Sequence, residues 1–204
     1  MPLTNRPKGY LFQKLISSKN IKMQNLILPL EQFFDPNYTD KGTTHSYLPV
    51  YETVLKELMN RHDTIRVMEI GIQRGGSIIG WLKALPGSSV TGVDCQKTVR
   101  IDCPNYKEYI MNAYDEEEIQ NISDRYDFIV EDGSHAFSDL LFVCKHYTKF
   151  LNPGGVLIIE DIPDVNWIPK MIRLLPQNYH ANVVDLRQVK GRWDDVMLII
   201  KEKV

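Results

Sequence analysis

The sequence predicts an α/β fold with a doubly wound, mostly parallel seven-stranded sheet that is closed by an antiparallel hairpin. Short apolar runs alternate with helical patterns from residue 66 onward, which is typical of a parallel sheet covered on both faces. The last two runs are separated by Lys190-Gly191 without a helical pattern, which favours the hairpin. A length of 204 residues, with 43% hydrophobic and 25% charged residues, suits one globular unit with a substantial core.

The individual elements follow from apolar spacing. Seven runs have the length of strands: 67–70, 89–93, 107–111, 126–131, 156–159, 181–186 and 196–200. Apolar residues at intervals of three or four predict helices over 77–85, 115–122 and 137–151, and another between Pro163 and Leu175. Right-handed crossovers then favour the doubly wound sheet, whose ligands bind at the carboxyl ends of the strands.

Residues 1–65 are less regular than the remainder and are predicted to form a lead-in to a domain that spans 66–204. Turn signals occur at residues 35–37 and 41–42. They precede a predicted helix over 47–60, whose apolar positions Val50, Val54 and Leu58 recur on one face. Residues 1–65 are therefore predicted to form a lead-in and a helix that cover the cofactor site of the main domain.

Charge and cysteine content restrict the classes of partner and compartment. The net charge is -2, so no global field would attract nucleic acid or an anionic membrane. The apolar stretch 26–30 is interrupted by Pro29 and is far too short to span a bilayer. An odd number of cysteines (Cys95, Cys103, Cys144), without a C-x-x-C pair or a secretory leader, leads us to expect a reducing, cytoplasmic setting.

A glycine-rich segment, residues 69–77, joins the first predicted strand to a helix. Gly71 and Gly75 permit a tight turn and close approach of a ligand, and Asp94 at the end of the next strand suits a ribose. Gln73 stands where the dinucleotide fingerprint requires glycine, which disfavours NAD and FAD. The segment therefore favours an adenosine ligand without phosphates, such as S-adenosylmethionine, although the glycines could merely shape a turn.

Acidic residues end two further strands that we expect to be neighbours. Asp132 follows the strand at 126–131, and Glu160-Asp161 follow the strand at 156–159. Crowded carboxylates repel one another unless a cation or protons intervene, and oxygen ligands favour Mg²⁺ or Mn²⁺. His135, on the loop after Asp132, is the candidate general base. The alternative is that these side chains only cap helices or bind loop amides.

The chain resembles class I S-adenosylmethionine-dependent methyltransferases over about residues 66–201. The resemblance rests on the glycine segment 69–77 followed by Gly92-Val93-Asp94. It implies a Rossmann-like methyltransferase fold in which the glycine turn lies against the methionine part, Asp94 holds the ribose and Asn112-Ala113 flank the adenine.

The motif at residues 132–135, with the later Glu160-Asp161 pair, further resembles metal-dependent O-methyltransferases of macrolide deoxysugars and the related cephalosporin-hydroxylase-like proteins. This resemblance implies that Asp132, Glu160 and Asp161 hold magnesium and that His135 acts as base. Residues 39–47 resemble the lead-in of these enzymes, so Tyr47 and His45 are expected to close the site.

The resulting expectation is a metal-dependent O-methyltransferase that modifies a sugar or glycan hydroxyl. Its acceptor would be a small molecule or glycan, with no nucleic-acid or membrane partner, and the chain could form a homo-oligomer. The alternatives are methylation of a catechol or other small phenol, and a non-catalytic nucleoside-binding module; a dehydrogenase is a more distant reading. The residues expected to bind cofactor are Tyr47, Glu69, Gly71, Gly75, Ser77, Asp94, Asn112 and Ala113.

Overall fold

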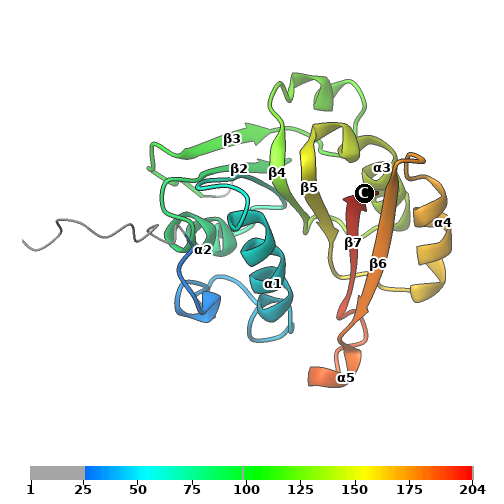
Figure 1. The fold of residues 1–204 in the computed structure, drawn as a ribbon, viewed down its shortest axis with the longest axis horizontal. Helices are drawn as coiled ribbons and strands as arrows, with labels where there is room; N and C mark the ends of the chain where they lie inside the picture. The colour runs from blue at the N-terminus through cyan, green and yellow to red at the C-terminus, as the bar shows by residue number, and fades with distance from the viewer. Residues whose placement is uncertain (1–25, 98, 204) are drawn as a thin grey trace, which may run out of the picture.

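The computed structural model describes residues 26–97 and 99–203 and contains the predicted seven-stranded sheet (Figure 1). The strand order is β3-β2-β1-β4-β5-β7-β6. Strands β1 to β5 pair in parallel, whereas β7 is antiparallel to both of its neighbours, β5 and β6. The strands are β1 (Arg66–Ile70), β2 (Ser89–Asp94), β3 (Tyr106–Ile110), β4 (Tyr126–Glu131), β5 (Leu151–Ile159), β6 (Tyr179–Asp185) and β7 (Val196–Glu202).

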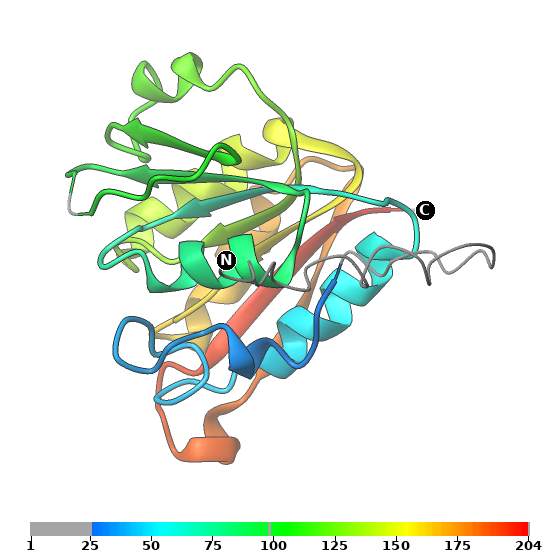
Figure 2. The ribbon, with the colours of Figure 1, turned by 90° about the vertical axis from the view of Figure 1, so that its left-hand side faces the viewer.

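Helices cover both faces of this sheet, which confirms the doubly wound arrangement (Figures 1 and 2). One face packs on α1 (Leu48–Met59) and α2 (Gly76–Ala84), and the other on α3 (Phe137–His146) and α4 (Ile168–Arg173). Successive side chains of a strand point to opposite faces, so Met68 belongs to the α3 side and Val67 to the α1 side. A one-turn helix, α5 (Arg187–Lys190), projects from the β6–β7 hairpin (Figure 2).

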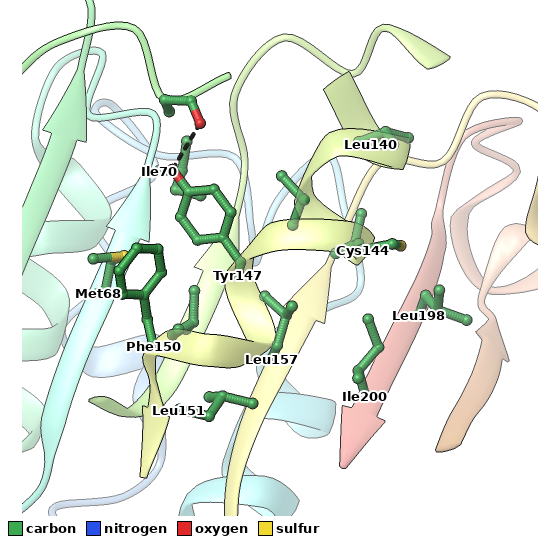
Figure 3. Close-up of a cluster of buried hydrophobic side chains, with 14 of the residues drawn as sticks. Met68, Ile70, Leu140, Cys144, Tyr147, Phe150, Leu151, Leu157, Leu198 and Ile200 are labelled. Atoms are coloured by element: carbon green, nitrogen blue, oxygen red, sulfur yellow. Dashed lines mark hydrogen bonds between the residues drawn. The ribbon is translucent and has the colours of Figure 1, made fainter. Parts of the chain in front are cut away.

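The core on the α3 side contains a buried tyrosine that reaches the functional edge of the sheet. Tyr147 is fully buried and packs beside Phe150, with ring centroids 5.5 Å apart (Figure 3). Its hydroxyl donates a hydrogen bond of 2.7 Å to the carbonyl oxygen of Ala113 in the loop after β3. This contact satisfies a polar atom inside an apolar core and fixes the position of that loop.

The lead-in shares the core on the α1 side. Of the predicted segment 1–65, residues 1–25 lie outside the described residues. Leu30 and Phe34 are buried, and the Phe34 ring meets Trp81 edge to face at 4.7 Å. A Cβ atom added to Gly80 would lie 2.7 Å from the Phe34 ring, so a glycine is required for the lead-in to pack this closely.

Several predicted boundaries differ from those observed. The helix predicted over 115–122 is wrong: only a 3-10 turn, Glu118–Asn121, forms there, because Asp115 accepts hydrogen bonds from the amides of Glu117 and Glu118. The helix predicted over 137–151 ends as α3 at His146 and a 3-10 turn to Phe150, after which β5 begins. The helix predicted between Pro163 and Leu175 forms a 3-10 turn, Val165–Trp167, and α4.

Within the described residues, no helix has both the length and the apolar character that crossing a membrane requires.

Candidate active site

A cavity of about 760 Å³ opens at the carboxyl ends of the parallel strands. The strand register aligns Ile70 with Val93 and Glu131, and Glu131 with Ile159, so the residues that follow these strands emerge at one edge. Eight of the predicted site residues line the cavity: Gly71, Ser77, Asp94, Asn112, Ala113, Asp132, His135 and Asp161.

The glycine turn after β1 is set by the packing of neighbouring strands. Gly71 has a positive φ of 89°, and a Cβ atom there would lie 1.9 Å from the carbonyl oxygen of Asp132. Gly75 is also left-handed, at φ 72°, and is the N-cap residue before α2, but it lies outside the cavity lining. The turn therefore brings the loops after β1 and β4 together at the floor of the cavity.

Asp94 connects this turn to β2. One carboxylate oxygen accepts hydrogen bonds from the amides of Ile72 (2.9 Å) and Gln73 (3.2 Å), and the other accepts one from Gln96 (3.0 Å). Desolvation acts to raise the pKa of Asp94, but these amide hydrogen bonds outweigh it and hold the pKa below its usual value. The cavity thus contains an ionised carboxylate with further lone pairs for ribose hydroxyls.

Asn112 and Ala113, in the loop after β3, also line the cavity. The Asn112 side-chain oxygen accepts a hydrogen bond from the amide of Tyr114 (3.0 Å), and the Asn112 amide donates to Glu118 (2.7 Å). Together with the Tyr147 contact to Ala113, these bonds order the loop that is predicted to flank adenine.

An outer cluster of polar groups, defined here as Asp132, His135 and Asp161, forms one wall of the cavity. Each residue has a donor atom within 4.8 Å of those of the other two. His135 Nε2 lies 3.7 Å from Asp132 Oδ1 and 3.8 Å from Asp161 Oδ2. His135 and Asp161 both have positive φ, 54° and 52°, an uncommon conformation for residues other than glycine. The two carboxylates are suitable ligands for a divalent metal ion, and the imidazole lies beside them.

Asp161 is held in place by the lead-in. Its Oδ1 accepts hydrogen bonds from the Tyr47 hydroxyl and lies 3.1 Å from His45 Nδ1. Desolvation raises the pKa of Asp161 above its usual value, against the opposing effect of His45. Tyr47 is almost fully buried and is not part of the cavity wall, but its hydroxyl contacts the wall at Asp161.

An inner cluster, defined here as Glu69, Asp132 and Glu160, lies behind that wall and surrounds Lys41. The ammonium group is 2.7 Å from Asp132 Oδ2 and 3.3 Å from Glu69 Oε1, and it contacts Glu160 Oε1. The Tyr51 hydroxyl donates to the other Glu160 oxygen. Desolvation works to lower the pKa of Lys41, but the carboxylates raise it well above its usual value, so the ammonium remains charged.

The loop after β4 is held by hydrogen bonds to another buried acid, Glu131. Its Oε1 accepts hydrogen bonds from the Tyr114 hydroxyl (2.7 Å) and the Gly133 amide (3.1 Å), and the Ser134 amide donates to that same hydroxyl (2.9 Å). A Cβ atom on Gly133 would lie 1.9 Å from the hydroxyl oxygen, which explains the glycine in this motif. Burial raises the pKa of Glu131 to about 7.

Comparison with known proteins agrees with this architecture. Residues 68–162 match a family model described as a methyltransferase domain. The chain is 25% identical over 146 residues to mycinamicin VI 2''-O-methyltransferase of Micromonospora griseorubida, an alignment that covers 67% of this chain and 35% of that protein.

A second relative is an 8-demethyl-8-alpha-L-rhamnosyl tetracenomycin-C 2'-O-methyltransferase of Streptomyces olivaceus, which is 26% identical over 139 residues, 63% of this chain and 36% of that one. The chain thus spans about a third of the length of these relatives. The MycE methyltransferase from the mycinamycin biosynthetic pathway, solved in complex with Mg and SAH, has the same fold, with a TM-score of 0.68 and 18% identity over 85% of this chain and 54% of that one.

The predicted residues separate into those that line the cavity and those that do not. Tyr47, Glu69, Gly75 and Glu160 are absent from the cavity lining. Glu69 is fully buried and accepts a hydrogen bond of 2.6 Å from Trp81 Nε1, and Glu160 is equally buried against Lys41 and Tyr51. The predicted metal trio is therefore divided, with Asp132 and Asp161 in the cavity and Glu160 beneath it.

Sequence reasoning missed Lys41, Tyr51 and the Glu131–Tyr114 pair. The signal for Lys41 was the surplus of strand-end acids, because buried carboxylates require a nearby cation. Tyr51 lies on the apolar face of α1 and carries no local sign that its hydroxyl reaches Glu160.

Proposed function

We propose that this protein is an S-adenosylmethionine-dependent and divalent-metal-dependent O-methyltransferase that acts on a sugar or glycan hydroxyl. The match of residues 68–162 to a methyltransferase family model and the named activities of the relatives support the reaction class. The cavity supports it independently, because it joins a ribose-type carboxylate, Asp94, to a polar cluster that suits a metal ion.

The cofactor would extend along the cavity from the adenine end to the outer cluster. Asn112 and Ala113 flank the adenine in this arrangement, Asp94 accepts hydrogen bonds from the ribose hydroxyls, and the turn at Gly71 lies against the methionine portion. S-adenosylmethionine supplies a methyl group that is already activated on sulfonium. The protein must then align the acceptor oxygen and manage its proton.

The donor set of the outer cluster fits a hard divalent ion. Glu69, Asp132 and Glu160 surround Lys41, and Asp161 lies close to Asp132; burial raises the pKa values of Glu69, Glu160 and Asp161, so a further cation at this edge would favour their ionised forms. Asp132 and Asp161 would hold Mg²⁺ or Mn²⁺ at the cavity wall. When bound, such an ion lowers the pKa of a hydroxyl that coordinates it.

His135 would accept the proton from the acceptor hydroxyl. Its Nε2 faces both acids of the outer cluster at 3.7 and 3.8 Å, distances longer than a hydrogen bond, so this nitrogen is not hydrogen-bonded to either carboxylate. Its other nitrogen, Nδ1, is buried and has no hydrogen-bond partner among the described residues. Nε2 is therefore the nitrogen that is available to the cavity.

The observation that carries this proposal is that Asp94, Asp132, His135 and Asp161 line one continuous cavity. The test is transfer of a radiolabelled methyl group to methyl rhamnoside and to catechol, with and without EDTA. We expect a methylated sugar, loss of the product with EDTA, and recovery with Mg²⁺ or Mn²⁺.

Other outcomes would lead to different conclusions. Methylation of catechol alone would replace the sugar acceptor with a phenol. Binding of S-adenosylhomocysteine without product from any acceptor, and without a metal effect, would indicate a nucleoside-binding module.

A further inference from the structure

The cavity at the carboxyl ends of the strands is lined by acidic side chains. Asp40, Asp94, Asp132 and Asp161 supply carboxylates, whereas neither lysine nor arginine occurs among the described residues of the lining. The chain as a whole is almost balanced, with 24 lysines and arginines against 26 acids, so the imbalance is local. A concave site lined by one sign of charge attracts ligands of the opposite sign and repels ligands of the same sign.

Basic side chains near the cavity are engaged outside its lining. Arg74, in the turn after β1, donates to the carbonyl oxygen of Asn37 at 3.5 Å. Lys190 donates to three carbonyl oxygens of the lead-in loop, and Lys41 is buried within the inner cluster. None of these three basic residues lines the cavity, so the lining carboxylates face the ligand space without a lysine or arginine beside them.

Three of the four lining carboxylates have a charge partner in the proposed complex. Asp132 and Asp161 would balance a divalent ion. S-adenosylmethionine carries a sulfonium, an ammonium and a carboxylate, and its single net positive charge would be matched by Asp94. Asp40 has no role in that complex, and its side chain is 61% exposed. The loaded cavity therefore keeps one unbalanced negative charge, at the lead-in.

Asp40 lies toward the end of the cavity at which the acceptor would bind. Its Oδ2 is 3.6 Å from Nε2 of His45, and the other nitrogen of the same ring is 3.1 Å from Asp161. Asp161 belongs to the outer cluster, where the acceptor hydroxyl would meet His135. An anionic group on the acceptor would thus approach Asp40 closely, and like charges brought together at a partly desolvated site repel one another.

We propose that Asp40 is a specificity-determining residue, which restricts the acceptor to sugars without a phosphate or another acidic group. This inference rests on the proposed methylation of a sugar and narrows its acceptor class. An activated sugar donor carries a nucleoside diphosphate at its anomeric carbon, and this cavity would repel it. The acceptor is then a glycoside, supplied by a glycosyl transfer in which an incoming hydroxyl oxygen loses its proton, bonds the anomeric carbon and displaces the nucleoside diphosphate.

The first test compares methyl rhamnoside with rhamnose 1-phosphate, which differ only at the anomeric oxygen. Saturation-transfer difference NMR on the full chain, with S-adenosylhomocysteine and Mg²⁺, measures both Kd values without methyl transfer. We expect methyl rhamnoside to bind about 10-fold or more tightly. Raising NaCl from about 50 to about 500 mM should reduce this ratio, because salt screens charge but not steric overlap. Equal affinities, a ratio that ignores salt, or no binding of either sugar would overturn the proposal.

The second test changes the charge at Asp40. Asp40→Asn keeps the shape of the side chain and should lower the ratio of the two Kd values by about 2- to 5-fold, and Asp40→Lys should lower it further. Glu31→Lys is the matched control, because it reverses the charge of an exposed lead-in residue outside the cavity lining. A wild-type ratio in both Asp40 variants, or an equal change in Glu31→Lys, would overturn the assignment. If Asp40→Lys does not fold, Asp40→Asn decides.

These titrations are independent of the proposed reaction. Binding of methyl rhamnoside without any methylated product would contradict the proposed methyl transfer and leave the assignment of Asp40 in place. Methylation of both sugars with equal kcat/KM would have the opposite meaning, because the reaction would stand and the selectivity would not.

Discussion

The carboxylate of Asp94 accepts a hydrogen bond of 2.9 Å from the backbone amide of Ile72. The acid that ends β2 therefore also holds the turn after β1, and the two features that suggested an adenosine site form one unit. Because amide hydrogen bonds keep the pKa of Asp94 below its usual value, this carboxylate stays ionised through the neutral range.

Replacement of Asp94 should weaken cofactor binding without preventing folding. Asp94→Asn keeps the shape of the side chain but removes the charge that would bind the ribose hydroxyls. We expect the Kd for S-adenosylhomocysteine to rise by about 10- to 100-fold, which corresponds to a charged hydrogen bond of ~1.5–3 kcal/mol, in isothermal titration calorimetry. Asp102→Asn, at an exposed aspartate outside the cavity lining, is the control. Unchanged affinity in Asp94→Asn would contradict the ribose assignment.

His135 should matter for turnover and not for cofactor affinity. His135→Gln preserves a polar side chain but removes the group that accepts the proton. We expect kcat to fall by about 10²- to 10⁴-fold with the Kd for S-adenosylhomocysteine unchanged. Radiolabel transfer and calorimetry on the same preparation provide the two values. Methyl transfer at the wild-type rate would remove His135 from the mechanism.

The glycine of the 132–135 loop should be coupled to Tyr114. In Gly133→Ala the new Cβ atom would meet the Tyr114 hydroxyl at 1.9 Å, so we expect a loss of about 1–3 kcal/mol in the free energy of unfolding. Tyr114→Phe removes that hydroxyl, and the double variant should be more stable than the sum of the two single effects. Strict additivity in urea unfolding would show that the hydroxyl is not the obstacle.

Glu131 should make stability depend on pH. Burial raises the pKa of Glu131 from its usual value of 4.5 to about 7, so the folded state binds a proton that the unfolded state releases. This contribution is fully present below about pH 4.5 and is lost as the pH rises through about 7, with a slope of up to about 1.4 kcal/mol per pH unit. Glu131→Gln cannot titrate, so its free energy of unfolding should fall less over this range. If the free energy of unfolding of wild type and of Glu131→Gln depends on pH in the same way, the raised pKa of Glu131 is refuted.

Lys190 should stabilise the lead-in loop over the cavity. Its ammonium donates hydrogen bonds to the carbonyl oxygens of Gly42 (2.7 Å), Thr43 (2.9 Å) and His45 (2.6 Å). Residues 38–40, just before this loop, line the cavity. In Lys190→Met we expect faster hydrogen exchange at the Thr43 and His45 amides and weaker binding of S-adenosylhomocysteine.

The control for this change is Lys203→Met, because Lys203 donates to the single carbonyl of Gln177, a residue outside the cavity lining. Equal exchange rates at Thr43 in wild type and Lys190→Met would show that the lysine does not hold the loop.

The sequence by itself determined the order of strands and helices and the residues at the functional edge. Alternating apolar runs indicate a parallel sheet because its strands are buried on both faces, and residues such as Asp94 and Asp132 follow such runs directly. Local patterns were weaker between β3 and β4, where Asp115 competes with helical hydrogen bonds and shortens the predicted helix to one 3-10 turn.

Only the tertiary structure decided which acids face the cavity. Glu160 and Asp161 are adjacent in the chain and both follow β5, yet Glu160 is fully buried, whereas Asp161, which has a φ of 52°, lines the cavity. Glu160 contacts Lys41, which is 91 residues from Asp132 and 119 residues from Glu160 in the chain. Contacts over such separations depend on how the lead-in packs against the sheet, and residue spacing carries no record of that packing.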